Sequence, residues 1–179
     1  MTVLVTKPEF NLRSKLTELD GVVPVEKMPS GSIIQTAFYH TTSTATSNSS
    51  SSYNSIGLWV DITPRIVGSM LEVSACIPNY SNNTDGGNWS NSFYCALYAT
   101  LPWQTTETRI STFEHPGPRY SDEFVQVVSP VFYQPALRAG TYMFNWRVKM
   151  TLGSDTHYFG RNVDSSTSQM NTTVREIKQ

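Results

Sequence analysis

The chain has 179 residues, of which 39% are hydrophobic and 12% aromatic but only 15% charged, and its 13 basic and 14 acidic residues give a net charge of -1. A chain of this length can bury one sizeable core, and so low a charged fraction is unlike a disordered chain or a helical bundle. Because the charge is nearly balanced and no basic block occurs, nothing neutralises phosphates as nucleic-acid binding requires, and we expect no nucleic-acid partner.

The N-terminal stretch "TKPEFNLRSKLTELDG" has the signals of a short helix. Thr6 and Glu9 have capping-box spacing, and Pro8 would lie in the first turn, where its missing N–H costs nothing. Gly21 suits the left-handed position that follows a helix. We therefore predict a helix over residues 7–19.

The apolar face of this helix is a narrow seam formed by Leu12, Leu16 and Leu19. Because a helix of about three to four turns is marginal alone in water, the seam requires a covering surface, either copies of itself or a partner protein. Docking on the chain's own domain is the alternative. Pro24 and Pro29 then predict an extended linker after the helix. Because the leucine seam needs a covering surface, residues 1–30 are interpreted as an attachment or oligomerisation segment.

From residue 31 onward the apolar residues recur with a period of two, as expected for half-buried strands. In "TYMFNWRVKM" one face would carry Tyr142, Phe144, Trp146, Val148 and Met150. Similar runs occupy residues 33–40, 58–63, 71–77, 92–100, 106–113, 124–133 and 172–178. About eight short strands without a helical pattern indicate an all-β domain, an antiparallel β-sandwich or jelly roll, over residues 31–179.

A long polar run, "TTSTATSNSSSSYNS" at residues 41–55, separates two of these strand patterns. Neither flank forms a sensible core without the other, so the run is predicted to be an exposed loop within one domain, at the rim of the sandwich.

Motifs for catalysis or metal binding are not found. The three histidines, His40, His115 and His157, are isolated, and there is no nucleophile elbow or phosphate-binding glycine loop. Asp- and Asn-rich turns hold oxygen donors that suit calcium, but they fit ordinary turn chemistry better. We expect no enzyme activity, no cofactor and no metal site.

The compartment is indicated by the N-terminus and the cysteines. The first residues lack the apolar region of a signal peptide, and no apolar run reaches the about 18 residues of a membrane span. We therefore expect synthesis in a cytoplasm and no membrane insertion. Cys76 and Cys95 lie in different strand patterns and are predicted to be buried free thiols.

Five aromatic residues lie in loop-like contexts and are the candidate binding residues. They are Tyr53, Tyr80, Trp89, Trp103 and Tyr120. Exposed aromatic rings suit sugar rings and protein partners. The alternative for each is a structural role, such as covering the end of the sandwich.

Several phrases resemble structural proteins of tailed bacteriophages, especially marine ones. "VTKPEFNLRSKLTELD" followed by "MPSGSIIQ" resembles the segment that opens a C-terminal β module of tail-fibre type. "VDITPRIVGSMLEVSACI" is similar to a strand pair of that module, and "FGRNVDSSTSQMNTTVREIKQ" resembles its closing loop and last strand. The chain departs from the pattern in the turn from Arg65 to Ser69 and in "VREI".

The resemblance implies a non-enzymatic virion protein, a homotrimer attached to other phage proteins by its N-terminal segment. Its β module would be presented outward to a host receptor or glycan, as in a tail fibre or spike. A capsid decoration or head spike protein without a receptor role remains an alternative. A lectin-like carbohydrate-binding module is a third, based on the loop aromatics alone.

Overall fold

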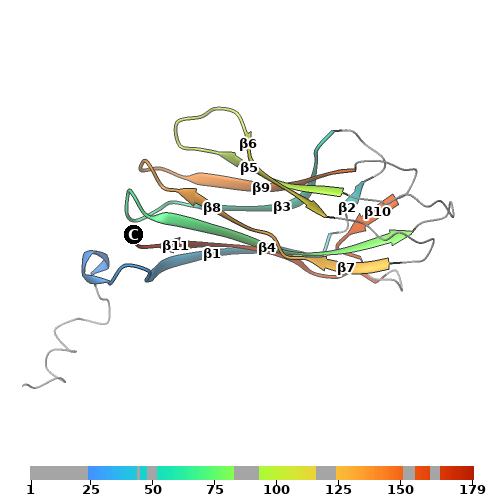
Figure 1. Cartoon of the computed structure of the whole chain (residues 1–179), viewed down its shortest axis with the longest axis horizontal. Coiled ribbons are helices and arrows are strands. Elements are labelled where there is room, and N and C mark those ends of the chain that lie inside the picture. The colour runs from blue at the N-terminus through green and yellow to red at the C-terminus, as the bar shows by residue number, and fades with distance from the viewer. Residues whose placement is uncertain are drawn as a thin grey trace, which may run out of the picture.

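The computed structural model describes residues 24–43, 45–47, 52–82, 93–115, 124–150, 156–161 and 166–179, and its strands form two antiparallel sheets packed face to face (Figure 1). The seven-stranded sheet contains β1 (Ile33–Thr41), β2 (Ala45–Ser47), β4 (Met70–Asn82), β7 (Phe124–Val128), β8 (Val131–Pro135), β10 (Thr156–Phe159) and β11 (Met170–Ile177). The four-stranded sheet has the order β3 (Asn54–Ile62), β9 (Tyr142–Met150), β5 (Phe93–Thr100) and β6 (Thr108–His115). The predicted antiparallel β-sandwich of jelly-roll type is confirmed.

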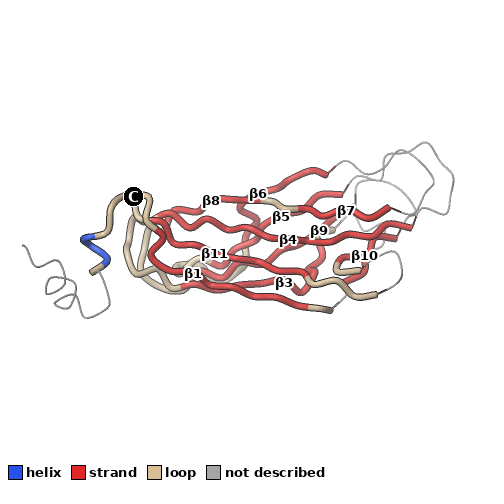
Figure 2. Tube along the Cα trace, turned by 90° about the horizontal axis from the view of Figure 1, so that it is seen from below, coloured by secondary structure: helices blue, strands red, loops and turns tan. Residues whose placement is uncertain are grey.

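The longest strand, β4, organises the larger sheet. Its first half pairs with β11 on one edge and β8 on the other, and its second half pairs with β10 and β7. β1 and β2 extend the sheet from β11 and β10. The strands run along the long axis of the molecule, and the C-terminus lies beside the start of β1 at one end (Figure 2).

The core lies between the sheets and follows the period-two pattern. On β9 the predicted inward set, Tyr142 to Met150, is buried at every second position. Trp146 is fully buried, and its Nε1 donates a 2.9 Å hydrogen bond to the Thr172 hydroxyl, which donates to the Ser74 carbonyl at 2.9 Å. This chain of bonds satisfies the indole N–H and connects the two sheets through the core.

Three local predictions are wrong. The run at residues 124–133 forms two strands, because Pro130 cannot donate to the ladder and the chain changes partner segments on β4 there. The polar run at 41–55 contains the short strand β2, which pairs with β10. The linker, expected to be extended, contains a single 3-10 turn, η1 (Val25–Lys27), which begins after Pro24, where a missing N–H is tolerated.

The turn between β3 and β4 is held by a buried carboxylate, Glu176. Its Oε1 accepts hydrogen bonds from the Ile66 N–H at 2.8 Å and the Ser69 hydroxyl at 2.9 Å. Its Oε2 accepts from the Arg65 N–H at 2.9 Å and from Gln35 Nε2 at 2.7 Å. The chain passes from one sheet to the other in this turn, so Glu176 fixes the geometry of that crossing.

A second buried polar group lies toward the opposite end of the sandwich. His157 on β10 is fully buried and contacts the Asn79 side chain at 3.1 Å. The rings of Phe93 and Phe159 lie 5.7 and 6.4 Å from its own. Burial lowers the pKa of His157 from 6.5 to about 4, so the imidazole is neutral at pH 7.

Both cysteines are free thiols, as predicted, but only one is buried. Cys95 points into the core from β5, and burial raises its pKa to about 12, which makes it a poor nucleophile. Cys76 is half-buried on β4, in the other sheet.

Candidate functional site

The outer face of the four-stranded sheet carries a cluster of aromatic and cationic side chains that are not in the core. We call this surface the aromatic face and define it by Tyr53, Trp59, Tyr94, Tyr98, Arg109, Arg147 and Lys149. It arises because successive side chains of a strand point to opposite sides of the sheet. When Phe144, Trp146 and Val148 enter the core, Asn145, Arg147 and Lys149 must face outward.

Cations and tyrosine rings alternate across this face. The Arg147 guanidinium lies 4.6 Å from the centre of the Tyr98 ring. Arg109 and Lys149 lie 5.2 and 5.4 Å from the centre of the Tyr53 ring, which is 5.8 Å from that of Tyr98. Such contacts are worth about 0.5 to 1 kcal/mol each at exposed sites. Together they hold long side chains in defined positions before any ligand arrives.

Tyr94, on β5 beside β6, lies at one edge of the aromatic face. Lys149 Nζ lies 5.3 Å from the centre of its ring. The negative charge of Glu114 raises the pKa of Tyr94 above its usual value of 10, and a hydrogen bond between the two side chains adds to the effect. Tyr94 therefore keeps its phenolic proton at neutral pH.

A shallow hollow of about 180 Å³ opens at the other end of the aromatic face. It is lined by Ser55, Trp59, Thr100, Glu107, Met143, Phe144 and Asn145. Strand pairing places Trp59 opposite Asn145, and Met143 opposite Thr100. The hollow thus crosses β9, with Trp59 on one wall and Glu107 on the other. The Trp59 and Met143 side chains are 47% and 50% exposed, so both present apolar surface to solvent.

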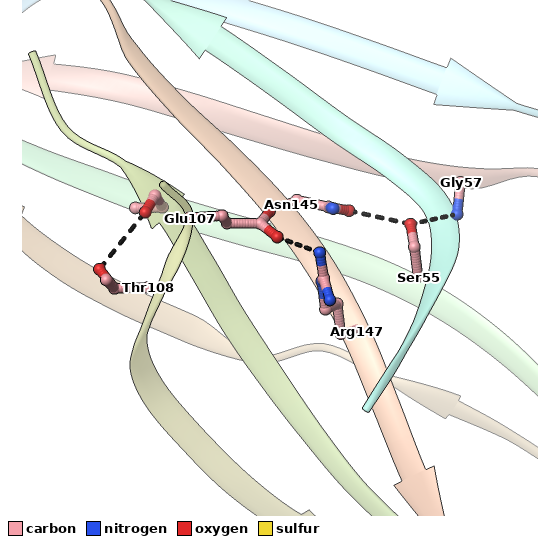
Figure 3. Close-up of polar contacts among 7 residues, drawn as sticks. Ser55, Gly57, Glu107, Thr108, Asn145 and Arg147 are labelled. Atoms are coloured by element: carbon pink, nitrogen blue, oxygen red, sulfur yellow. Dashed lines mark hydrogen bonds and ion pairs between the residues drawn. The ribbon is translucent and has the colours of Figure 1, made fainter. Parts of the chain in front are cut away.

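Polar contacts fix the walls of the hollow (Figure 3). The Ser55 hydroxyl donates to Asn145 Oδ1 at 3.1 Å and accepts from the Gly57 N–H at 3.3 Å. Gly57 has a φ of 72°, and the β3 to β9 register shifts beside it, so this glycine allows the irregular turn of the strand that points its N–H at Ser55. On the opposite wall, Arg147 and Glu107 form an ion pair.

A larger hollow, of about 380 Å³, lies at the open edge between β6 and the β7–β8 bend. It is lined by Phe113 and by residues 127–132, and Ser129 supplies its single polar side chain. A small-molecule site requires a few convergent polar groups to orient the ligand, and this lining lacks them. The hollow beside Trp59 is therefore the better candidate.

Two of the five predicted aromatic residues are exposed or half-exposed in the structure. Tyr53 lies just before β3 and belongs to the aromatic face. Trp103 is 40% exposed between β5 and β6, but its ring packs edge-on against Tyr142 at 6.2 Å, with Arg138 5.3 Å from its centre. The neighbouring Pro102 lies so close to Gly140 that a Cβ there would be 2.7 Å away. Trp103 thus covers the end of the sandwich, as in the structural alternative.

Of the other predicted residues, only Tyr80 lies within the described part of the chain, and it does not join this surface. Tyr80, expected in a loop, lies within β4, is only 5% exposed and stacks on Tyr158 at 5.8 Å. Trp89 and Tyr120 lie outside the described residues, as does the predicted helix over residues 7–19 with Leu12, Leu16 and Leu19.

Sequence reasoning missed Trp59, Tyr94, Tyr98 and Asn145. The available signal was the alternation itself, since each occupies an outward position of a strand whose other face is apolar. A large aromatic residue on the polar side of a strand is such a signal, because nothing in the chain's own core requires it there.

Two further findings concern metal sites and membrane spans in the part of the chain that the structure describes. There, no three or more His, Cys, Asp or Glu side chains come together in a way that could hold a metal ion. The same described ranges include no helix with the length and apolar character needed to cross a membrane.

The chain matches no protein-family model and no curated protein. Among solved structures it is similar to one titled "Structure of Eiger TNF from S. frugiperda", with 11% sequence identity and a TM-score of 0.42. The match covers 80% of this chain and 93% of that one. So distant a similarity carries no argument about function, which must come from the surfaces described above.

Proposed function

We propose that this chain is a non-enzymatic structural protein of a bacteriophage virion, of tail-fibre or spike type, and that its β-sandwich contacts the host surface. The observation that carries the proposal is the aromatic face, on which tyrosine, tryptophan and arginine side chains are held together in the open. These residue types dominate the binding energy of protein interfaces. The sequence resemblance at both ends of the chain supplies the virion context.

The placement of the described part of the linker beside the C-terminus supports attachment at one end of the sandwich. Lys178 Nζ donates to the Glu26 carbonyl at 2.7 Å, and backbone bonds connect Lys178 with Gly31 and Ser32 at 2.8 and 2.9 Å. The linker is therefore fixed to the last strand. A virion partner that holds residues 1–30 would bind at this end and leave the aromatic face accessible along the side.

The virion proposal predicts both a location and a phenotype. Immuno-electron microscopy should place the protein at a tail tip or spike. Particles carrying Tyr98→Ala with Lys149→Ala should adsorb to host cells at least tenfold more slowly, because the double change removes two members of the aromatic face that both contact Tyr53. Val67→Ala is the control, since Val67 is exposed in the turn after β3, away from this face.

The alternative, a capsid decoration protein without a receptor role, makes different predictions for the same particles. It requires label on the capsid and normal adsorption by the double variant. Particles that contain none of this protein would refute both versions.

We also propose that the chain forms a homotrimer through the outer face of the seven-stranded sheet. Strand pairing places Phe38, Thr173, Ser74 and Val131 in one row across β1, β11, β4 and β8. Phe38 is 59% exposed in this row, and Tyr133 in the next row is 61% exposed. Small side chains between exposed apolar ones form a flat surface that a second subunit can cover.

The trimer is tested by sedimentation of the full chain at micromolar concentration. We expect a trimer for the wild type and a monomer for Phe38→Glu, because a carboxylate in an apolar interface loses its hydration without gaining a partner. Val67→Glu adds the same charge at an exposed apolar residue in the turn after β3, outside the proposed interface, and should leave the trimer intact. A wild-type monomer would contradict the proposal.

A further inference from the structure

We infer that the hollow beside Trp59 binds one neutral pyranose ring of a glycan. A pyranose has an apolar face of C–H groups and a rim of hydroxyls, so a site for it combines a flat aromatic surface with hydrogen-bonding groups at the side. The hollow provides both within one small space. This sugar site deepens the proposed function. It rests on that function only in one respect, namely that the sugar would come from a glycan on the host surface.

Trp59 supplies the aromatic surface. It lies on the edge strand β3 and stacks on Tyr39 of β1, with ring centres 5.0 Å apart and an angle of 28° between the planes. One side of the indole is therefore supported by Tyr39, while almost half of the side chain remains accessible in the hollow. A supported ring loses little conformational freedom when a ligand stacks on it.

Asn145 and Glu107 supply hydrogen-bonding groups on either side of the floor. Ser55 donates to Asn145 Oδ1 and so orients the amide, and no described residue accepts a hydrogen bond from Asn145 Nδ2. That nitrogen has two N–H donors for sugar hydroxyl oxygens. Glu107 uses Oε2 for Arg147, which leaves Oε1 to accept from a hydroxyl. The Asn145 donors and the Glu107 acceptor thus line the same hollow as Trp59.

The charge and size of the hollow limit the ligand. Arg147 neutralises Glu107, so the site offers no unpaired cation for an acidic sugar. The volume, about 180 Å³, is below the roughly 300 to 1,000 Å³ of pockets that bury a drug-sized ligand. A single neutral ring, at the end of a glycan or within one that runs along the aromatic face, fits both limits.

Saturation-transfer NMR on the full chain tests the inference with methyl pyranosides of glucose, galactose, mannose and N-acetylglucosamine. We expect at least one of them to receive saturation on the C–H groups of one ring face. Trp59→Ala should weaken the binding of that sugar at least tenfold, Trp59→Phe should weaken it less, and Asn145→Ala should weaken it with the stacking surface intact.

Trp103→Ala is the matched control, because it removes another exposed tryptophan and should leave sugar binding unchanged. If Trp59→Ala fails to fold, Asn145→Ala and Glu107→Gln carry the test. The inference is overturned if none of the four sugars receives saturation, or if the Trp59 and Asn145 variants bind as the wild type does. Sugar binding by a protein that is missing from virions would refute the virion proposal and leave this inference standing.

Discussion

Glu176→Ala should lower the free energy of unfolding by at least about 3 kcal/mol, because each buried donor that loses its acceptor costs about 1 to 3 kcal/mol. Two backbone N–H groups and one N–H of the Gln35 amide donate to this carboxylate, as does the Ser69 hydroxyl, which has the Ile66 carbonyl as a second acceptor at 2.8 Å. Glu176 is fully buried, so water cannot easily replace it without opening the turn between β3 and β4. The measurement is urea unfolding at pH 7.

Two further variants separate the hydrogen bonds from the charge. Glu176→Gln keeps the shape but turns one acceptor into a donor that faces other donors, so it should also destabilise the fold, by less than alanine. Glu26→Ala removes an exposed carboxylate and should change the free energy of unfolding by less than about 0.5 kcal/mol. Equal stability of Glu176→Ala and the wild type would show that the turn does not depend on this carboxylate.

The second large effect concerns pH. The pKa of His157 is 6.5 when the chain is unfolded and about 4 when it is folded, because burial disfavours the imidazolium. Below pH 6.5 the unfolded chain binds a proton that the folded chain cannot, so stability must fall as the pH falls from about 6.5 to about 4. The separation of the two pKa values corresponds to about 3 kcal/mol, most of which should be lost by pH 4.5.

The pH dependence is measured as the free energy of unfolding between pH 7.5 and 4.5 for the wild type and for His157→Gln. The variant will be less stable at pH 7, but its curve should be flatter, and the difference between the two curves cancels the carboxylates that they share. His40→Gln, at an exposed position of β1, is the control and should follow the wild type. Parallel curves for wild type and His157→Gln would refute the assignment.

The sequence predicts the sandwich well because period-two burial is a local property. On β9 apolar and polar residues alternate along the sequence, so the sequence alone tells which residues face the core and which face solvent. β2 and β10 were missed because three or four residues are too few to display a period, and β2 consists of small residues.

The candidate site was less predictable because it depends on contacts between distant segments. Trp59 meets Asn145 only through the register of β3 on β9, and Glu107 reaches the same hollow from the position just before β6. The prediction that Tyr80 lies in an exposed loop was wrong because β4 is buried at every position from Ile77 to Tyr80. Neither face of the strand is open to solvent there. Loop context was the wrong criterion, whereas aromatic residues on outward strand positions mark the surface.

The hydrogen bond from Trp146 to Thr172 has a mechanical consequence for a protein that is pulled. In the proposed virion role, a cell held at the aromatic face would apply force to the four-stranded sheet, while the virion would resist through the linker before β1. One route for the load passes through the core, from β9 to β11, and from β11 into β1 along a ladder that extends from Thr41 to Ile33. Because that ladder runs parallel to the pull, its hydrogen bonds are sheared together instead of opening one at a time. The sandwich is therefore arranged to resist tension along its length.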